Sequence, residues 1–75
     1  MTITQLRNTI SNLELTELAG TPVAAHAVVQ VIDPHQLVVV VFHGHDTPIV
    51  EHAIRSQNYA TTELTSANDI ITVTI

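Results

Sequence analysis

Apolar side chains recur at helical spacing at the beginning of the chain. Four of them fall on one face of a helix: Ile3, Leu6, Ile10 and Leu13. Thr2 is followed three residues later by Gln5, which fits a capping box, in which each side chain bonds the backbone N–H of the other residue. The pattern predicts a helix over residues 2–13, and residues 14–19 either extend it or form a loop.

An alternating segment follows, and a turn separates it from a second apolar segment. Residues 23–32 carry one apolar face and one mixed face, which is typical of a strand with one side buried. Asp33 and Pro34 stand in the order that a type I turn favours. Residues 37–43 predict a second strand, and because it is apolar on both faces it needs cover on both faces.

The position of the turn sets the pairing of these two strands. A turn centred on residues 34–35 places Val29 opposite Val40 and His26 opposite His43. A one-residue bulge would destroy this pairing. In this register the two histidines are either a proton-sensitive pair or two half-buried side chains that pack in a sheet.

The last third of the chain predicts one more helix and one more strand. Thr47 is a good N-cap residue and Pro48 a good first helical residue, and an apolar stripe continues to about Asn58. Residues 61–64 form either a short strand or a loop. Residues 70–75 are rich in β-branched side chains and predict a terminal strand.

These elements predict one small α+β domain over residues 1–75, in the order helix, strand, strand, helix, strand. We expect a three-stranded, mostly antiparallel sheet with both helices on one face. The other face then lacks cover and is predicted to be an interaction surface. In the register given above its apolar residues are Val28, Ile32, Leu37, Val39 and Val41. Sheet-to-sheet or edge-to-edge association into a homo-oligomer would cover them.

Composition limits how so small a chain can be stabilised and where it can reside. The 75 residues include no cysteine, which excludes disulfides and thiolate metal sites and leaves oligomerisation or a histidine metal site. The longest apolar run, residues 37–42, is far shorter than the roughly 20 residues that span a membrane. The first residues show no basic segment or apolar signal core. We therefore expect a cytoplasmic protein without a membrane partner.

Charge and side-chain chemistry limit the function classes. Seven acidic residues against two arginines give a formal net charge of −5. Arg7 and Arg55 cannot form the cationic face that nucleic-acid binding needs. The sequence contains no nucleophile with a base and an orienting group, so neither an enzyme nor a cofactor is expected. We expect a non-enzymatic binding module that associates with itself and with a protein partner or small ligand, acting as a regulator or inhibitor of another macromolecule.

Three of the five histidines form a candidate metal site. His43 and His45 are separated by one residue at a strand end, so their side chains project to the same side. His52 lies in the first turns of the following helix and could approach them. Three imidazoles with an open fourth position would suit zinc. The alternative is that these are polar residues at a strand end and a helix start.

The start of the second predicted helix also offers a candidate ligand site. The free backbone amides at Asp46 and Thr47 could hold an anion, and Arg55 could bind a carboxylate or a phosphate. The alternatives are ordinary helix capping at Asp46 and Thr47, and for Arg55 an ion pair with Glu51 one helical turn away.

One resemblance to a known family concerns the order of the elements. The Leu-Ala-Gly-Thr-Pro-Val segment at residues 18–23, a hairpin, Asp46 and the helix at residues 49–58 together resemble the small phage anti-Thoeris proteins. The resemblance covers roughly residues 3–58. It implies an oligomer that sequesters a cyclic nucleotide signal of a host defence system, with Arg55 as a phosphate contact. The chain departs from that family in its shorter C-terminal part and in its scarcity of basic residues.

Overall fold

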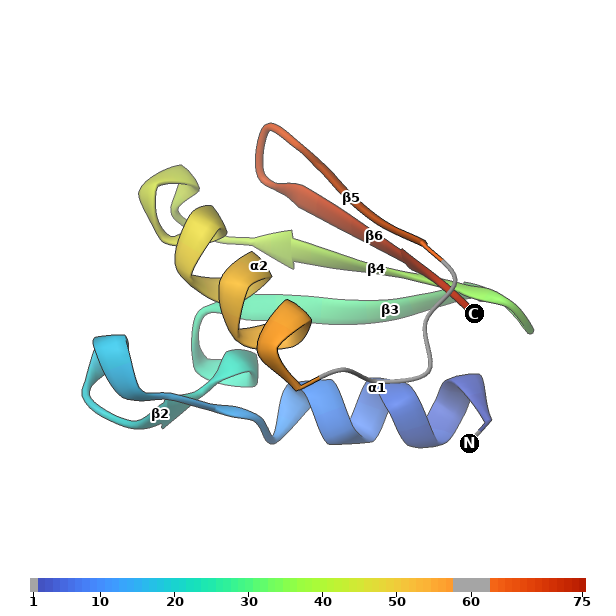
Figure 1. The fold of residues 1–75 in the computed structure, drawn as a ribbon, viewed down its shortest axis with the longest axis horizontal. Coiled ribbons are helices and arrows are strands. Elements are labelled where there is room, and N and C mark those ends of the chain that lie inside the picture. Colours follow the sequence, from blue (N-terminus) through green and yellow to red (C-terminus); the bar gives the residue numbers. More distant parts are fainter. Residues whose placement is uncertain (1, 58–62) are drawn as a thin grey trace.

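In the computed structural model, which describes residues 2–57 and 63–75, two α-helices pack against a four-stranded antiparallel sheet (Figure 1). Across the sheet the strands lie in the order β3 (Ala27–Asp33), β4 (Gln36–Val41), β6 (Ile70–Thr74) and β5 (Glu63–Ala67). The α+β class is confirmed. The predicted three-stranded sheet is wrong by one strand, because β5 pairs with β6 and forms an additional edge.

Helix α1 (Ile3–Ser11) begins at the capping box that the sequence predicts. The Thr2 backbone N–H donates to Gln5 Oε1 at 2.8 Å, and the Gln5 N–H donates to Thr2 Oγ1 at 3.2 Å. The helix buries its apolar stripe, including Leu6 and Ile10, against the sheet. It ends two residues before Leu13, which lies in the segment that leads to the next element.

A short two-stranded ribbon occupies the segment that the sequence left open. Strands β1 (Glu14–Leu15) and β2 (Thr21–Pro22) pair antiparallel around the 3₁₀ turn η1 (Thr16–Leu18). Ala19 and Gly20 close the ribbon in the left-handed region, with φ angles of 61° and 72°. The ribbon therefore supplies the connection between α1 and the main sheet.

The predicted strand over residues 23–32 begins later than expected. Residues Val23–Ala25 form a second 3₁₀ turn, η2, and the His26 N–H donates to the Val23 carbonyl at 2.9 Å. The Val23 N–H donates to the Leu13 carbonyl at 2.8 Å, which ties this turn to the end of α1. Val23 is fully buried, so its side chain belongs to the core although it lies outside the strand.

The hairpin of β3 and β4 contains a one-residue bulge. Asp33 pairs with Gln36 across the turn, as a turn centred on residues 34–35 requires, but the next pair is Val31 with Leu37. Ile32 is therefore an extra residue in β3 with no counterpart in β4. Beyond this point every pair of the hairpin is shifted by one position relative to the predicted register.

The shift exchanges the two faces of β4. Val29 lies opposite Val39 and not opposite Val40, and Ala27 lies opposite Val41. Because paired residues point to the same side of a sheet, Val39 and Val41 join Val29 on the side of the helices. Val39 is fully buried there, whereas Val40 points to the opposite side.

Helix α2 (Thr47–Ser56) crosses in front of the sheet in Figure 1. The 3₁₀ turn η3 (Gly44–Asp46) leads directly into it, so the N-cap residue is Asp46. The prediction of Thr47 as the N-cap is wrong, because the chain is already helical before it. The predicted end at Asn58 lies outside the described residues, and the helix ends at Ser56.

The C-terminal strand pairs within its own chain. Strand β6 lies between β4 and β5, and its alternate residues Ile71 and Val73 are fully buried, as the sequence predicts. The turn to β6 uses Asn68 at a φ of 56°, a conformation that asparagine tolerates. Of the segment predicted as a strand or loop, residues 61 and 62 lie outside the described residues, while β5 begins at Glu63.

The bulge predicts that two adjacent valines of β4 contribute differently to the stability of the fold. Val39→Ala should lower the free energy of unfolding by about 2–3 kcal/mol, because it removes buried methyl groups and leaves a cavity. Val38→Ala, at a half-buried position of the opposite face, should cost less than half as much. Urea denaturation at a low protein concentration, at which each chain unfolds on its own, measures both. Equal losses would contradict the assignment of the two faces.

Candidate functional site

The face of the sheet that points away from both helices is the candidate functional site, and we call it the outer face. The register defines its central residues, which belong to all four strands: Val28, Gln30, Val38, Val40, Thr65, Ala67, Ile70 and Thr72. Phe42 continues the alternation beyond β4, since its N–H donates to the His26 carbonyl at 2.9 Å. No helix of the described chain contributes to the cover of this face.

Apolar side chains gather at one end of the outer face. Val28, Val40, Ile70 and Ala67 form one cross-strand row. Phe42 lies beyond the row, and its side chain remains 55% exposed, while Ile70 remains 45% exposed. Within the four strands, the charged residues of this face are Asp33 and Glu63, which lie at the opposite end. The result is an uncharged apolar patch with a polar margin.

Of the five residues predicted to lie on the uncovered face, two are exposed and three are buried. Val28 and Ile32 are exposed, as predicted. Leu37, Val39 and Val41 are buried in the core under the helices. The physical reason is the bulge at Ile32, which turns these three side chains inward and turns their neighbours outward.

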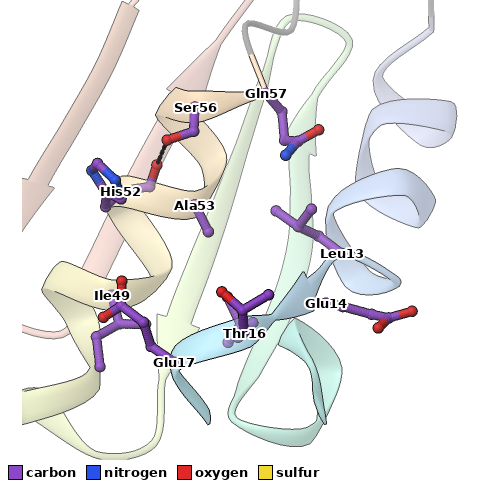
Figure 2. Close-up of a pocket in the computed structure, with 10 residues that line it drawn as sticks. Leu13, Glu14, Thr16, Glu17, Ile49, His52, Ala53, Ser56 and Gln57 are labelled. Carbon is purple, nitrogen blue, oxygen red and sulfur yellow. Dashed lines mark hydrogen bonds between the residues drawn. The ribbon is translucent and has the colours of Figure 1, made fainter. Parts of the chain in front are cut away.

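The three candidate metal ligands do not gather around one point. The rings of His43 and His45 stack with their centroids 5.8 Å apart, and His45 Nε2 lies 3.4 Å from Asp46 Oδ1. His52 projects from α2 toward a different part of the surface, shown in Figure 2. Within residues 2–57 and 63–75, no group of three or more histidine, aspartate or glutamate side chains is arranged to hold a metal ion.

The predicted pairing of His26 with His43 is also absent, because the bulge places His26 opposite Phe42. The His26 ring contacts the Thr21 hydroxyl through Nε2. That hydroxyl donates its proton to the Leu18 carbonyl at 2.6 Å, so it accepts from His26 Nε2–H. His26 therefore holds the ribbon of β1 and β2 against the start of β3.

The three predicted ligand-binding residues lie at opposite ends of α2. Asp46 and Thr47 precede and begin the helix, and both are only 5% exposed. The Thr47 hydroxyl has no hydrogen-bond partner among the described residues. Arg55 lies in the last turn, so the helix keeps it away from the other two residues. Arg55 therefore does not join Asp46 and Thr47 in one site.

Arg55 is engaged in a polar contact between α2 and the edge strand β5. Its Nη2 donates to Glu51 Oε1 at 2.8 Å, and its Nε donates to the same oxygen at 3.3 Å. Ser66 Oγ of β5 donates to Glu51 Oε2 at 2.6 Å. The bond from Ser66, followed by those from Arg55, holds the pKa of Glu51 below its ordinary value. We call these three residues the α2–β5 clamp.

The sequence predicts one contact of the α2–β5 clamp but not the other. The i,i+4 spacing of Glu51 and Arg55 predicts their ion pair. Ser66 is 15 residues from Glu51 in the sequence, so its contact depends on the placement of β5. Because Glu51 accepts hydrogen bonds from both Ser66 and Arg55, its carboxylate has a structural role, which is to join α2 to β5.

The chain matches none of the protein-family models and none of the curated proteins with which it was compared. The resemblance to the anti-Thoeris proteins therefore stays a prediction. Within the described residues, the two α-helices are too short or too polar to cross a membrane.

The clamp predicts a pH effect with a definite sign. Because folding lowers the pKa of Glu51, its contribution to stability is present above the ordinary glutamate titration near pH 4.5 and is lost as the pH falls through the lowered value. Ser66→Ala should raise the pKa of Glu51 and reduce stability at neutral pH by up to about 1 kcal/mol, since the clamp is partly exposed to solvent.

An NMR titration of the Glu51 side-chain carboxyl measures the pKa directly. Thr65→Ala, one position along β5 and directed to the outer face, is the matched control and should leave the Glu51 pKa unchanged. An unchanged pKa in Ser66→Ala would show that Ser66 does not act on this carboxylate.

Proposed function

We propose that this protein is a non-enzymatic binding module that works as a homodimer, with two copies packed through their outer faces. The observation that supports this is the apolar patch of Val28, Val40, Phe42, Ala67 and Ile70, which neither helix covers. Apolar patches of this kind on small domains are typical of interaction sites.

Charge favours a second copy as the occupant of the outer face. The chain carries a formal net charge of −5, so two copies repel each other over most of their surfaces. The centre of the outer face carries no charged side chain, and Asp33 and Glu63 lie at its margin. Two copies can therefore meet at this face without bringing like charges together at the centre.

The size of the outer face sets the expected strength of association. Four strands about 4.8 Å apart, with about five residues each, make a face of a few hundred Å². A standard interface buries roughly 800 Å² on each partner. The outer face is smaller than this, in the size class of weak and transient contacts. We therefore expect a dimer that dissociates on dilution.

The helical side of the sheet would carry the activity of such a dimer. Pairing through the outer faces leaves both copies of α1 and α2 directed away from the interface. Binding of a partner macromolecule there, in order to regulate or inhibit it, is the task that we propose. The dimer would present two identical copies of that surface.

Ile70→Glu should convert the dimer to a folded monomer. It introduces a carboxylate into the row formed by Val40 and Ala67, where a second copy would have to desolvate it. Ile70 is exposed in the single chain, so the fold should survive. Thr4→Glu adds the same charge on the exposed surface of α1 and should leave the dimer intact.

Sedimentation equilibrium over a range of protein concentrations measures the mass against the 8.1 kDa of one chain, and circular dichroism confirms the fold of each variant. Phe42→Ser is a second test of the same patch that adds no charge. A native chain that stays monomeric at all concentrations, or a dimer that survives both substitutions, would overturn the proposal.

A further inference from the structure

A cavity of about 260 Å³ lies between α2 and the segment that contains β1 and η1 (Figure 2). The helix contributes Ile49, His52, Ala53, Ser56 and Gln57 to its lining, and Leu15 forms part of the opposite wall. These helical positions lie on a face distinct from the stripe that enters the core and from the Glu51 side of the clamp. The cavity is therefore on the helical side of the sheet, away from the outer face.

The cavity has an apolar wall and a polar opening. Leu15 is buried, and Ile49 and Ala53 are half-buried. Ser56 and Gln57 are exposed at the end of α2, as is Glu17 on the opposite side. Such a combination suits a guest with an aliphatic stem and a polar tip.

Electrostatics at the opening favours a positively charged tip. The ionisable lining residues are Glu14, Glu17 and His52, and the lining includes neither arginine of the chain. Within the described residues, neither carboxylate makes a hydrogen bond or an ion pair. Figure 2 shows the Glu14 side chain directed away from α2, so Glu17 is the better placed of the two.

The end of α2 borders the cavity at the opposite end from Glu17, which lies beside Ile49 in Figure 2. The helix ends at Ser56, with Gln57 as its C-cap, and both residues line the cavity. The last carbonyl groups of a helix carry a partial negative charge that stabilises a nearby cation. Arg55, the basic residue of this last turn, is held by Glu51 of the clamp and is not among the lining residues.

We propose that this cavity binds one arginine side chain of a partner protein. The aliphatic stem packs against Leu15, Ile49 and Ala53, and the guanidinium meets the Glu17 carboxylate. The volume is below the roughly 300–1,000 Å³ of pockets that enclose drug-sized ligands, and it suits a single long side chain. A guanidinium can bond a carboxylate through two parallel N–H groups.

The test uses N-acetyl-arginine amide as the probe and N-acetyl-citrulline amide as its uncharged counterpart of nearly the same shape. In an NMR titration, the arginine compound should give saturable shifts at the amides of residues 13–17 and 49–57, and the citrulline compound should give weaker binding. Equal binding of both compounds, or shifts spread over the whole acidic surface, would overturn the proposal.

A charge-matched pair of variants separates the site from general attraction to an acidic protein. Glu17→Gln removes one carboxylate at the cavity, and Glu63→Gln removes one on the outer face, so both variants have the same net charge. Glu17→Gln should weaken arginine binding about threefold or more, and Glu63→Gln should leave it unchanged. Equal affinities in the two variants would contradict the site.

The outcome is independent of the proposed dimer. The titration reports the cavity in monomer and dimer alike, since the cavity and the outer face lie on different sides of the sheet. Repeating it on Ile70→Glu should give the same affinity as the native chain. Loss of binding in a folded Ile70→Glu variant would show that the cavity needs the second copy, which contradicts a site complete within one chain.

Discussion

The single extra residue in β3 determines which half of β4 becomes core. Ile32 has no partner in the neighbouring strand, and beyond it each pair of the hairpin is shifted by one position. Since β4 is apolar on both faces, the hydrophobic effect alone does not choose between Val39 and Val40. The bulge makes the choice, and the two helices then cover the Val39 side. The uncovered patch that supports the proposed dimer is the consequence for the other side.

Helix α2 is the element that connects the core to the surface on which we place the partner. One face of the helix, which includes Val50 and Ile54, is buried against the sheet. Its second face carries Glu51 and Arg55, which bind the edge strand. Two neighbours therefore fix the helix, and the remaining face can line a cavity whose shape is set in advance. A preformed site of this kind binds with little cost in conformational entropy.

Local interactions were predictable from the sequence, and contacts between distant segments were not. The capping box of Thr2 and Gln5 and the α+β class depend on neighbours in the chain and are confirmed. The bulge at Ile32 is local in position, but alternation of apolar residues cannot reveal it when both faces of the next strand are apolar. The engagement of Arg55 with Glu51 could be anticipated. The contact of Ser66 could not, because β5 extends to Ala67, beyond the residues 61–64 for which the sequence predicts a strand or a loop.

The two proposed surfaces have opposite chemistry, and their separation on the fold would allow the proposed dimer to bind a partner at two sites. The outer face is apolar and nearly free of charge, whereas the cavity opens beside Glu17 and the negative end of a helix. A single exposed arginine contact is weak. Two cavities on one dimer would raise the apparent affinity for a partner with two suitably spaced arginines, because the second contact forms within the complex. Concentration-dependent pairing through Phe42 and Ile70 would then control how strongly the acidic cavities hold their partner.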